Sequence, residues 1–378
     1  MARYTWQQDK WPRMTWRAAE LEGVLSQAAF AEGKLVGALS SIGFDLRNRA
    51  GFETISDEIV SSAAIEGETL NRADVRSSVA RRMEIALQEG KEREDHALDA
   101  RVEMLLDATR GWDRPMSVER LNAWHAALFP TGYSGLSRIR VAAYRDDSEG
   151  PMRVVSRYGS LMRTHFEAPP ATRLGNEMTD FLVWLNESTA EPFLVKAALA
   201  HLRFLTLHPY EDGNGRLART MTEWVLSRGE KSPLRFYSLS AEIQREKSAY
   251  YEELEHAQRN SLDVTRWIGW FVGCHTRAVA AAMENLSGIL RKAEFWNEHR
   301  DFPLNEHQQK ILNLMLDDFE GHLTSSKWAE ICKVSQDTAG REIDQLVSAR
   351  ILFRQGQGRS THYTPEPAEL CLVQQILD

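Results

Sequence analysis

The sequence predicts a mainly α-helical protein. Long stretches repeat apolar residues at helical spacing, and the runs that favour β-structure are short and confined to residues 152–167 and 351–363. With 378 residues, of which 43% are hydrophobic and 26% charged, the chain is long enough for two or three globular domains. We expect an N-terminal helical region over 1–113, a helical core over 114–290 and a small C-terminal domain over 302–378.

One helix of the N-terminal region ends in a carboxylate that local helix physics does not explain. In the helix expected over about residues 52–67, Ile59, Ser62 and Glu66 fall on one face, so Glu66 shares the face that buries isoleucine. Gly67 follows it and suits a helix C-cap. Because the helix macrodipole disfavours a carboxylate at this end, Glu66 either has a specific partner or is a solvent-exposed residue at a frayed terminus.

The central region predicts helices around one hairpin. Ser117 is an expected N-cap, and two β-favouring runs, 152–156 and 163–167, predict a hairpin. Helices are expected over 176–186 and 192–207. At the very start of the chain, three tryptophans are expected to pin an extended segment onto the helical body: Trp6, Trp11 and Trp16.

The C-terminal region has the element order of a winged helix, three short helices and then two strands with a glycine turn. The helices are expected over 307–316, 325–332 and 335–346. Residues 304–378 hold seven Lys/Arg against eleven Asp/Glu, and the recognition helix carries Asp337, Glu342 and Asp344. Because attraction to phosphate dominates affinity for DNA, this composition disfavours DNA and favours a structural or protein-contacting module.

Composition also excludes several classes of protein. A formal net charge of −8 and a pI near 5.8 argue against a nucleic-acid-binding body. The three cysteines, Cys274, Cys332 and Cys371, are far apart and indicate neither a disulfide framework nor a zinc site, so we expect a reducing cytoplasm. No apolar leader and no run of about 18 apolar residues is present, so we expect neither secretion nor a membrane span.

The residues that carry chemistry are concentrated in the run His-Pro-Tyr-Glu-Asp-Gly-Asn-Gly-Arg-Leu-Ala-Arg, from His208 to Arg219. Gly213 and Gly215 can adopt φ > 0, so the N–H groups of this turn can converge on a phosphate at the start of the next helix. His208 precedes a proline, which ends the preceding helix and places a base with a pKa near neutrality beside that phosphate.

Other side chains of this run suit a nucleotide and its metal. Asp212 offers a hard oxygen ligand for Mg²⁺. Arg216 and Arg219, three apart on a helix, can hold further phosphates bidentately. The plainer interpretation is a corner between two helices with a core histidine, and such a corner has no use for this order of charges and glycines.

This run resembles the signature of Fic (Fic/Doc superfamily) proteins, His-Pro-Phe-x-Asp/Glu-Gly-Asn-Gly-Arg-x-x-Arg, with Tyr210 in the usual Phe position. The stretch from Ser62 to Gly67, Ser-Ala-Ala-Ile-Glu-Gly, resembles the Ser/Thr-x-x-x-Glu-Gly/Asn motif of family members that carry their own inhibitory helix. The resemblance implies a Fic-type helical bundle with a β-hairpin flap. It also implies that Glu66 pairs with Arg219 and occupies the place of the ATP γ-phosphate.

The resemblance assigns further residues. The phosphates of ATP would be held by Gly213, Asn214, Gly215, Arg216 and Arg219. The adenine pocket would include Tyr250, Tyr251 and Gln258, for which packing in the core or on the surface is the alternative. The flap, which would align a target segment by strand addition, would include Val154, Val155, His165 and Phe166.

The expected activity is that of a protein adenylyltransferase using ATP and Mg²⁺. His208 would take the proton from a Ser, Thr or Tyr hydroxyl of a target protein, and auto-modification and a homodimer are compatible with the family. Family members that use other nucleotide-linked donors exist. The alternatives are removal of AMP from a target, with Glu66 orienting a water, and a nucleotide-sensing winged-helix transcription regulator or scaffold. The acidic recognition helix counts against the regulator.

Overall fold

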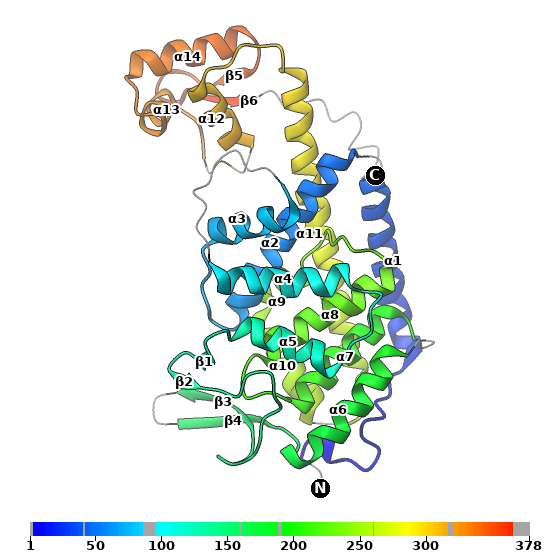
Figure 1. The fold of residues 1–378 in the computed structure, drawn as a ribbon. Coiled ribbons are helices and arrows are strands. Elements are labelled where there is room, and N and C mark those ends of the chain that lie inside the picture. Colours follow the sequence, from blue (N-terminus) through cyan, green and yellow to red (C-terminus); the bar gives the residue numbers. More distant parts are fainter. Residues whose placement is uncertain are drawn as a thin grey trace. The chain divides into compact units, whose positions relative to one another are not determined.

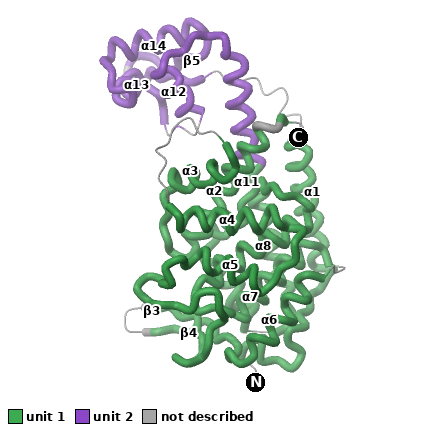
Figure 2. The backbone as a smooth tube through the Cα atoms, viewed as in Figure 1, with its two compact units in different colours: residues 1–282 green, residues 283–378 purple. Residues whose placement is uncertain are grey.

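The computed structural model describes residues 3–40, 42–85, 95–158, 161–187, 191–259, 261–316, 319 and 321–365. The chain divides into two compact units, residues 1–282 and 283–378 (Figure 2). Within the described part, no helix combines the length and the apolar character that crossing a bilayer requires.

The first unit is built almost entirely from helices, as predicted (Figure 1). They are α1 (Ala18–Ser40), α2 (Phe44–Ile65), α3 (Arg72–Met83), α4 (His96–Arg110), α5 (Val118–Leu128), α6 (Ala171–Asn186), α7 (Phe193–Leu207), α8 (Asn214–Glu230), α9 (Leu239–Arg245), α10 (Lys247–Arg259) and α11 (Thr265–Glu298), the last of which extends past residue 282. Helix α8 packs against both α7 and α4, and Figure 1 shows it in the middle of the unit. The predicted N-cap of α5 is confirmed, because the Ser117 hydroxyl accepts a hydrogen bond from the Arg120 N–H at 3.2 Å.

Helix α2 holds the predicted inhibitory segment in a fixed place. The helix begins at Phe44, earlier than expected, and ends at Ile65, so that Glu66 is its C-cap and Gly67 follows with φ +81°. The apolar side chains of α2 pack in one core with those of α3 and α4; this core includes Phe52, Ile55, Ile59, Val75, Val79 and Val102. Burial of this face sets where the end of the helix, and with it Glu66, lies.

The N-terminal tryptophans pin the first residues to the unit, as predicted. The Trp6 indole N–H donates to the Glu167 carbonyl at 2.7 Å, and the Trp11 indole donates to the Glu177 carboxylate at 3.0 Å. The main chain of Thr15 forms an isolated bridge with Asp263. Segments far apart in sequence are thereby held at one end of the unit.

The strands of the described chain form three two-stranded antiparallel sheets. They are β1 (Tyr133–Ser134) with β2 (Ser137–Arg138), β3 (Arg153–Tyr158) with β4 (Leu161–Glu167), and β5 (Leu352–Gln355) with β6 (His362–Pro365). The β3–β4 pair is the predicted hairpin; its turn, residues 159–160, lies outside the described residues. A register shift between Val154 and Val155 breaks the alternation of side chains there, and both valines are exposed.

The second unit has the element order expected of the C-terminal module: α12 (Glu306–Leu316), α13 (Ser325–Cys332) and α14 (Gln336–Ser348), then β5 and β6. Residues 366–378 of the expected module lie outside the described residues. The sequence suggested that Glu342 lies on the exposed face of α14, and this expectation is wrong. Its carboxylate is buried and accepts hydrogen bonds from the Trp328 indole at 2.8 Å and the Asn305 amide at 3.0 Å. The exposed face of α14 is therefore less acidic than a count of its residues suggests.

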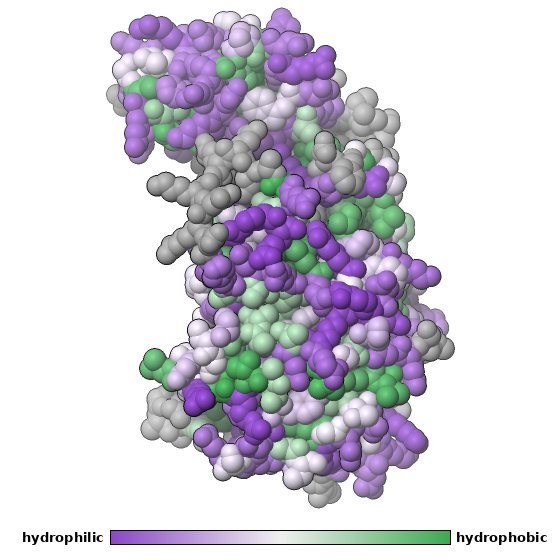
Figure 3. All heavy atoms as spheres, in the orientation of Figure 1, coloured by the Kyte–Doolittle hydropathy of each residue, from purple (hydrophilic) through white to green (hydrophobic). Residues whose placement is uncertain are grey.

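On the face of the molecule drawn in Figure 3, hydropathy alone does not single out a site. In the view of Figure 3, hydrophilic residues predominate and apolar residues form scattered groups among them. The candidate site therefore has to be built from side-chain chemistry.

Candidate phosphate-binding site

His208 sits at the junction of α7 and the signature loop in a left-handed backbone conformation, φ 49° and ψ 58°. Its N–H donates to the Phe204 carbonyl at 2.9 Å and closes α7, as the sequence predicted. Its carbonyl accepts a hydrogen bond from Arg145 Nε at 2.8 Å. Arg145 is buried and also donates to the Pro169 carbonyl at 2.6 Å, so it ties His208 to the chain that follows the hairpin.

The imidazole of His208 is neutral and has a defined tautomer. Burial lowers its pKa to about 4. Nδ1 lies 3.4 Å from the Leu205 carbonyl oxygen, which can only accept a hydrogen bond. This contact assigns the proton to Nδ1 and leaves a lone pair on Nε2 that can accept a proton.

The signature loop is braced from inside. Asn214 Oδ1 accepts from the Tyr210 N–H at 3.0 Å, and Asn214 Nδ2 donates to the Tyr210 carbonyl at 2.7 Å. The Asn214 side chain is thus committed to the loop, and only its backbone N–H is left for a phosphate. The Tyr210 hydroxyl donates to Asn122 at 2.8 Å, and its ring stacks on His125 with centroids 4.3 Å apart.

His125 fixes the loop from the side of α5. Its Nδ1 accepts from the Ala142 N–H at 3.1 Å, so the ring proton lies on Nε2, which is 3.2 Å from the Asp212 carbonyl. Burial lowers the pKa of His125, which keeps this tautomer neutral. Neither His125 nor Arg145 was predicted from the sequence, because each is a single residue that belongs to no recognisable motif.

The turn at the start of α8 is shaped for an anion. Gly213 has φ +80° and caps the helix without a side-chain hydrogen bond. Gly215 lies in the first turn, and a β-carbon there would overlap the Glu66 carboxylate. A helix N-terminus attracts negative charge, and here two carboxylates of the protein lie beside it: Asp212, which accepts from the Gly213 N–H at 2.5 Å, and Glu66 beside Gly215.

The contact predicted between Glu66 and Arg219 is present. Arg219 is buried, and its guanidinium donates to the Glu66 carboxylate at 2.6 Å. The same guanidinium donates to the Ser62 hydroxyl at 2.9 Å and to the Ser62 carbonyl at 3.0 Å. Ser62, Glu66 and Arg219, which were singled out in two motifs far apart in sequence, thus form one hydrogen-bonded group.

Arg216 contacts a different carboxylate. Its guanidinium lies over the Phe129 ring, 4.9 Å from the ring centroid, and donates to Glu68 at 3.3 Å. Glu68 also accepts a hydrogen bond from Arg101 of α4 at 2.6 Å. Sequence analysis missed Glu68 and Arg101, although Glu68 stands only two positions after Glu66.

Asp212 offers one carboxylate that could bind a hard cation such as Mg²⁺. Its side chain is half-exposed, lies 3.9 Å from Arg216 and accepts from the Ser134 hydroxyl. One accessible carboxylate is what a Mg²⁺ ion that keeps most of its waters and binds phosphate oxygens requires. The residues present are therefore compatible with a magnesium ion bound together with a nucleotide.

The three residues assigned to adenine lie in different surroundings. Tyr250 is buried, and its hydroxyl contacts His201 Nε2 at 2.9 Å. Gln258 is buried too, with its amide 3.4 Å from the Thr206 hydroxyl. Tyr251 is exposed, and its hydroxyl lies 3.4 Å from the Ile65 carbonyl at the end of α2. Of the three residues, only Tyr251 is exposed, and its ring lies 5.1 Å from that of Tyr250.

The hairpin is anchored to α10. His165 Nδ1 contacts the Glu255 carboxylate at 2.7 Å, and Arg259 donates to the carbonyls of Thr164 and His165, at 2.7 Å each. The Phe166 side chain is buried against Tyr4, so only its backbone is left for a target. Val154 and Val155 of β3 remain exposed, as does Met162 of β4.

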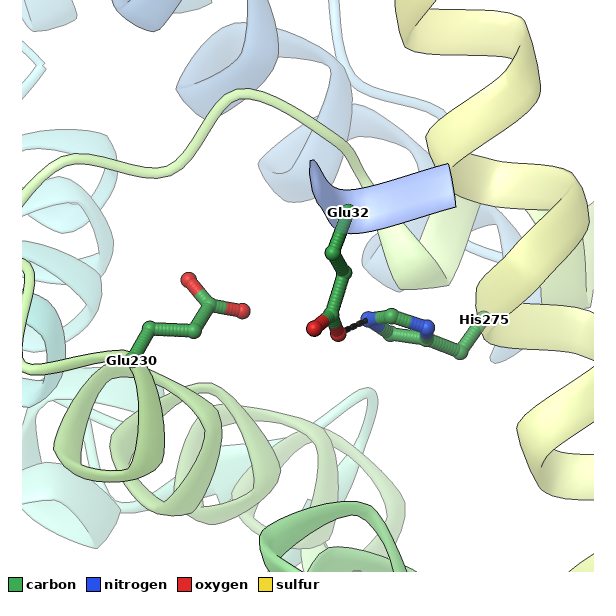
Figure 4. Close-up of side chains that lie close together, drawn as sticks. All are labelled: Glu32, Glu230 and His275. Carbon is green, nitrogen blue, oxygen red and sulfur yellow. Dashed lines mark ion pairs between the residues drawn. The ribbon is translucent and has the colours of Figure 1, made fainter. Parts of the chain in front are cut away.

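A second polar cluster lies away from this site. In the described part of the chain, Glu32, Glu230 and His275 bring ligand-type atoms within 4.8 Å of one another (Figure 4). Arg235 donates to Glu230 at 2.6 Å, and the Tyr237 hydroxyl lies 2.8 Å from His275. Since Arg235 already supplies positive charge to these carboxylates, the cluster has the composition of a buried ion-pair network.

Comparisons with known proteins now bear on the signature loop. Residues 115–226 match the Fic/DOC family, and residues 4–85 match a domain of unknown function, DUF4172. Residues 115–226 form a Fic/DOC domain. A solved Fic family protein from Desulfovibrio desulfuricans shares the fold, with a TM-score of 0.54 and 20% identity over 94% of this chain and 98% of that one.

Relatives of the Fic domain carry enzyme names. The Protein adenylyltransferase Fic of Aedes aegypti is 25% identical over 61% of this chain and 42% of its own length. The Uridine 5'-monophosphate transferase of Xanthomonas campestris is 29% identical over 30% of this chain and 21% of its own length. The chain thus spans less than half the length of these relatives.

Proposed function

We propose that this Fic protein transfers AMP from ATP to a Ser, Thr or Tyr hydroxyl of a target protein, and that Glu66 inhibits the transfer. The observation that supports this most is the position of Glu66, whose carboxylate contacts Arg219 and lies against Gly215. A negatively charged group there occupies the place where the motif would hold an outer phosphate of ATP.

The chemical step uses the free nitrogen of His208. Nε2 takes the proton from the attacking hydroxyl, and the hydroxyl oxygen bonds to the α-phosphorus while the bond to the bridging oxygen of the β-phosphate breaks. Pyrophosphate leaves with the negative charge. Burial holds the pKa of His208 near 4, and the negative charge of bound phosphates raises it toward neutrality, which favours proton uptake during attack.

The remaining groups stabilise charge. The backbone N–H groups of Asn214, Gly215 and Arg216 would surround the α-phosphate, whereas the Gly213 N–H donates to the Asp212 carboxylate at 2.5 Å. Arg216 and Arg219 would hold the outer phosphates. Asp212 would hold Mg²⁺, which neutralises charge on the leaving phosphates. The outer strand of the hairpin, with Val154 and Val155, aligns the target backbone. In the inhibited state Arg219 has Glu66 as its partner, and ATP has to displace it.

The test is labelling with α-³²P-ATP in the Glu66→Gly background, with auto-modification as the readout. Adding His208→Ala should abolish labelling and leave ATP binding within about threefold, because the imidazole acts only in the chemical step. The matched control is His96→Ala, an exposed histidine on α4, which should label at the Glu66→Gly rate. Undiminished labelling by the His208 variant would refute the mechanism.

The nucleotide of the donor is tested in the same assay. The match to a uridine 5'-monophosphate transferase makes UTP the relevant competitor, but that match covers 30% of this chain, against 61% for the adenylyltransferase. We therefore expect excess unlabelled ATP to suppress labelling and equal UTP to leave it nearly unchanged. Stronger suppression by UTP would replace AMP transfer with UMP transfer.

A further inference from the structure

Two arginines from different helices share one carboxylate beside the Glu66 contact. Arg101 of α4 donates to Glu68 Oε1 at 2.6 Å, and Arg216 of α8 donates to Glu68 Oε2 at 3.3 Å. The arginine side chains are 16% and 11% exposed, whereas Glu68 is 36% exposed. Two partly buried guanidinium groups therefore converge on one anion, and that anion is the more accessible partner.

The arginines have capacity left for a larger anion. In the described part of the chain, the Nε atoms of Arg101 and Arg216 are buried and have no hydrogen-bond acceptor. Both side chains line a cavity of about 30 Å³ that also reaches Ser62 and Thr220. A carboxylate has two oxygens and satisfies two donors here, whereas a phosphate presents three oxygens.

The geometry of the chain links this contact to the one at Arg219. Only Gly67, with φ +81°, separates Glu66 from Glu68. A movement of the backbone that takes Glu66 away from Arg219 would therefore carry Glu68 with it. Arg101 and Arg216 would then lose the carboxylate that they share, and among the described residues only Arg216 would keep another one nearby, Asp212 at 3.9 Å, so the loss is unfavourable until another anion arrives.

We propose that Arg101 is a third phosphate-binding arginine of the nucleotide site and that Glu68 is a second internal carboxylate occupying its place. The ligand class is the terminal phosphates of a nucleoside triphosphate. This inference rests on the proposed function, and it extends the site beyond residues 115–226, because Arg101 lies in α4. The two carboxylates have different partners: Glu66 pairs with Arg219 beside the N-terminus of α8, and Glu68 pairs with Arg101 and Arg216.

The alternative is that Glu68 and Arg101 merely join the segment after α2 to α4. The two roles differ in what they do to different ligands. A phosphate-binding arginine affects ligands with outer phosphates and leaves AMP unaffected, whereas a structural pair affects all ligands of the site alike.

The experiment is calorimetry with ATP, AMP and inorganic tripolyphosphate on the full chain in the Glu66→Gly background. Adding Arg101→Ala should weaken ATP and tripolyphosphate about tenfold or more, the size expected for one charge-assisted contact, and leave AMP unchanged. The matched control is Arg82→Ala, an arginine of α3 that pairs with Asp99 and Glu103 of α4, which should bind all three ligands as the background does. Adding Glu68→Gln instead should tighten ATP, because a competitor is removed.

The outcomes separate this inference from the function it rests on. Equal ATP binding by the Arg101 and Arg82 variants, or equal weakening of AMP and ATP by Arg101→Ala, overturns the third arginine. Arg101-dependent ATP binding without any AMP transfer keeps the third arginine and overturns the proposed function. If the Glu66→Gly protein binds neither ATP nor tripolyphosphate, both fall.

Discussion

Helix α8 has buried arginine–carboxylate contacts at both ends, and the partners are arranged oppositely. In the first turns the arginines belong to α8 and the carboxylates come from the segment after α2, as in Arg219 with Glu66 at 2.6 Å. In the C-terminal half the carboxylates belong to α8 and the arginine comes from the following loop: Arg235 contacts Glu223 at 2.7 Å and Glu230 at 2.6 Å.

The two ends differ most in how accessible the carboxylate is. Glu66 is 33% exposed, whereas Glu223 is 2% exposed. A partly exposed carboxylate can return to water when another anion takes its arginine, but a buried one cannot leave without a large desolvation change. We therefore call the N-terminal end of α8, where Arg219 contacts Glu66, the exchangeable end. The C-terminal end, where Arg235 contacts Glu223 and Glu230, is the permanent end.

The largest effect is expected at the permanent end. Arg235→Met should lower the free energy of unfolding by about 3–5 kcal/mol, because it leaves the buried Glu223 and the partly buried Glu230 without their counter-charge. Arg219→Met, at the other end, should cost about 1 kcal/mol, because Glu66 can turn to solvent. Urea denaturation followed by tryptophan fluorescence measures both, and equal costs would remove the distinction.

The exchangeable end is tested by activity. If Glu66 keeps the ATP-binding state at a small population, Glu66→Gly should raise AMP transfer about tenfold to a hundredfold. Glu66→Gln should give a smaller rise, since its amide oxygen still accepts from Arg219 without carrying charge. Glu230→Gln, which removes a carboxylate from the other end, should leave the rate of the folded protein unchanged. A Glu66→Gly rate equal to that of the wild type would show that α2 is purely structural.

The permanent end should also make stability depend on pH. Burial raises the pKa of Glu32 from 4.5 to about 7, so between these values the folded protein keeps a proton that the unfolded chain loses. The Glu32 contribution to stability is therefore lost as pH rises from about 4.5 to 7. Glu32→Gln should match the wild type near pH 4 and exceed it by about 1 kcal/mol at pH 8.

The quantity to measure is the difference in free energy of unfolding between Glu32→Gln and the wild type at each pH. Burial lowers the pKa of the neighbouring His275 to about 3, which gives a slope of opposite sign between about pH 3 and 6.5. Subtracting the wild-type curve removes this background. A Glu32→Gln difference that is constant from pH 4 to 8 would mean that the pKa of Glu32 is the same in the folded and unfolded states.

The smallest effect is expected for Tyr210→Phe, which restores the residue usual in the signature. It removes the hydroxyl bonded to Asn122 and should cost about 1 kcal/mol of stability, with transfer changed less than about threefold. Asn122→Ala should have a similar cost, and the double variant should cost little more than either single one. Full additivity would show that the two groups act independently.

Local patterns predicted much of this molecule. Helical periodicity, the Ser117 cap and the two β-favouring runs located the helices and the hairpin, and the glycines and charges after His208 located the anion site. The contact between Glu66 and Arg219 was predictable because each residue belongs to a motif with its own spacing. Each of these motifs can be recognised because its own residues lie within a few positions of one another.

What escaped prediction depends on contacts between distant segments. Arg145 and Arg101 are ordinary arginines in sequence, and only the packed structure brings one to the His208 carbonyl and the other to Glu68. Glu342 counted as acidic surface until its burial beside Trp328 was seen. Phe166 had the right place in the hairpin but faces Tyr4. Burial and pairing of single polar residues are decided by tertiary packing.

Gly215 limits how this protein could change during evolution. The absence of a side chain lets Glu66 lie against the backbone of α8, and an incoming phosphate would need the same space. If the proposed function holds, a larger residue that excluded the carboxylate would exclude the phosphate too, so no substitution at Gly215 would remove the proposed inhibition and keep the activity. Changes that relax or tighten the proposed inhibition would then have to arise on the α2 side.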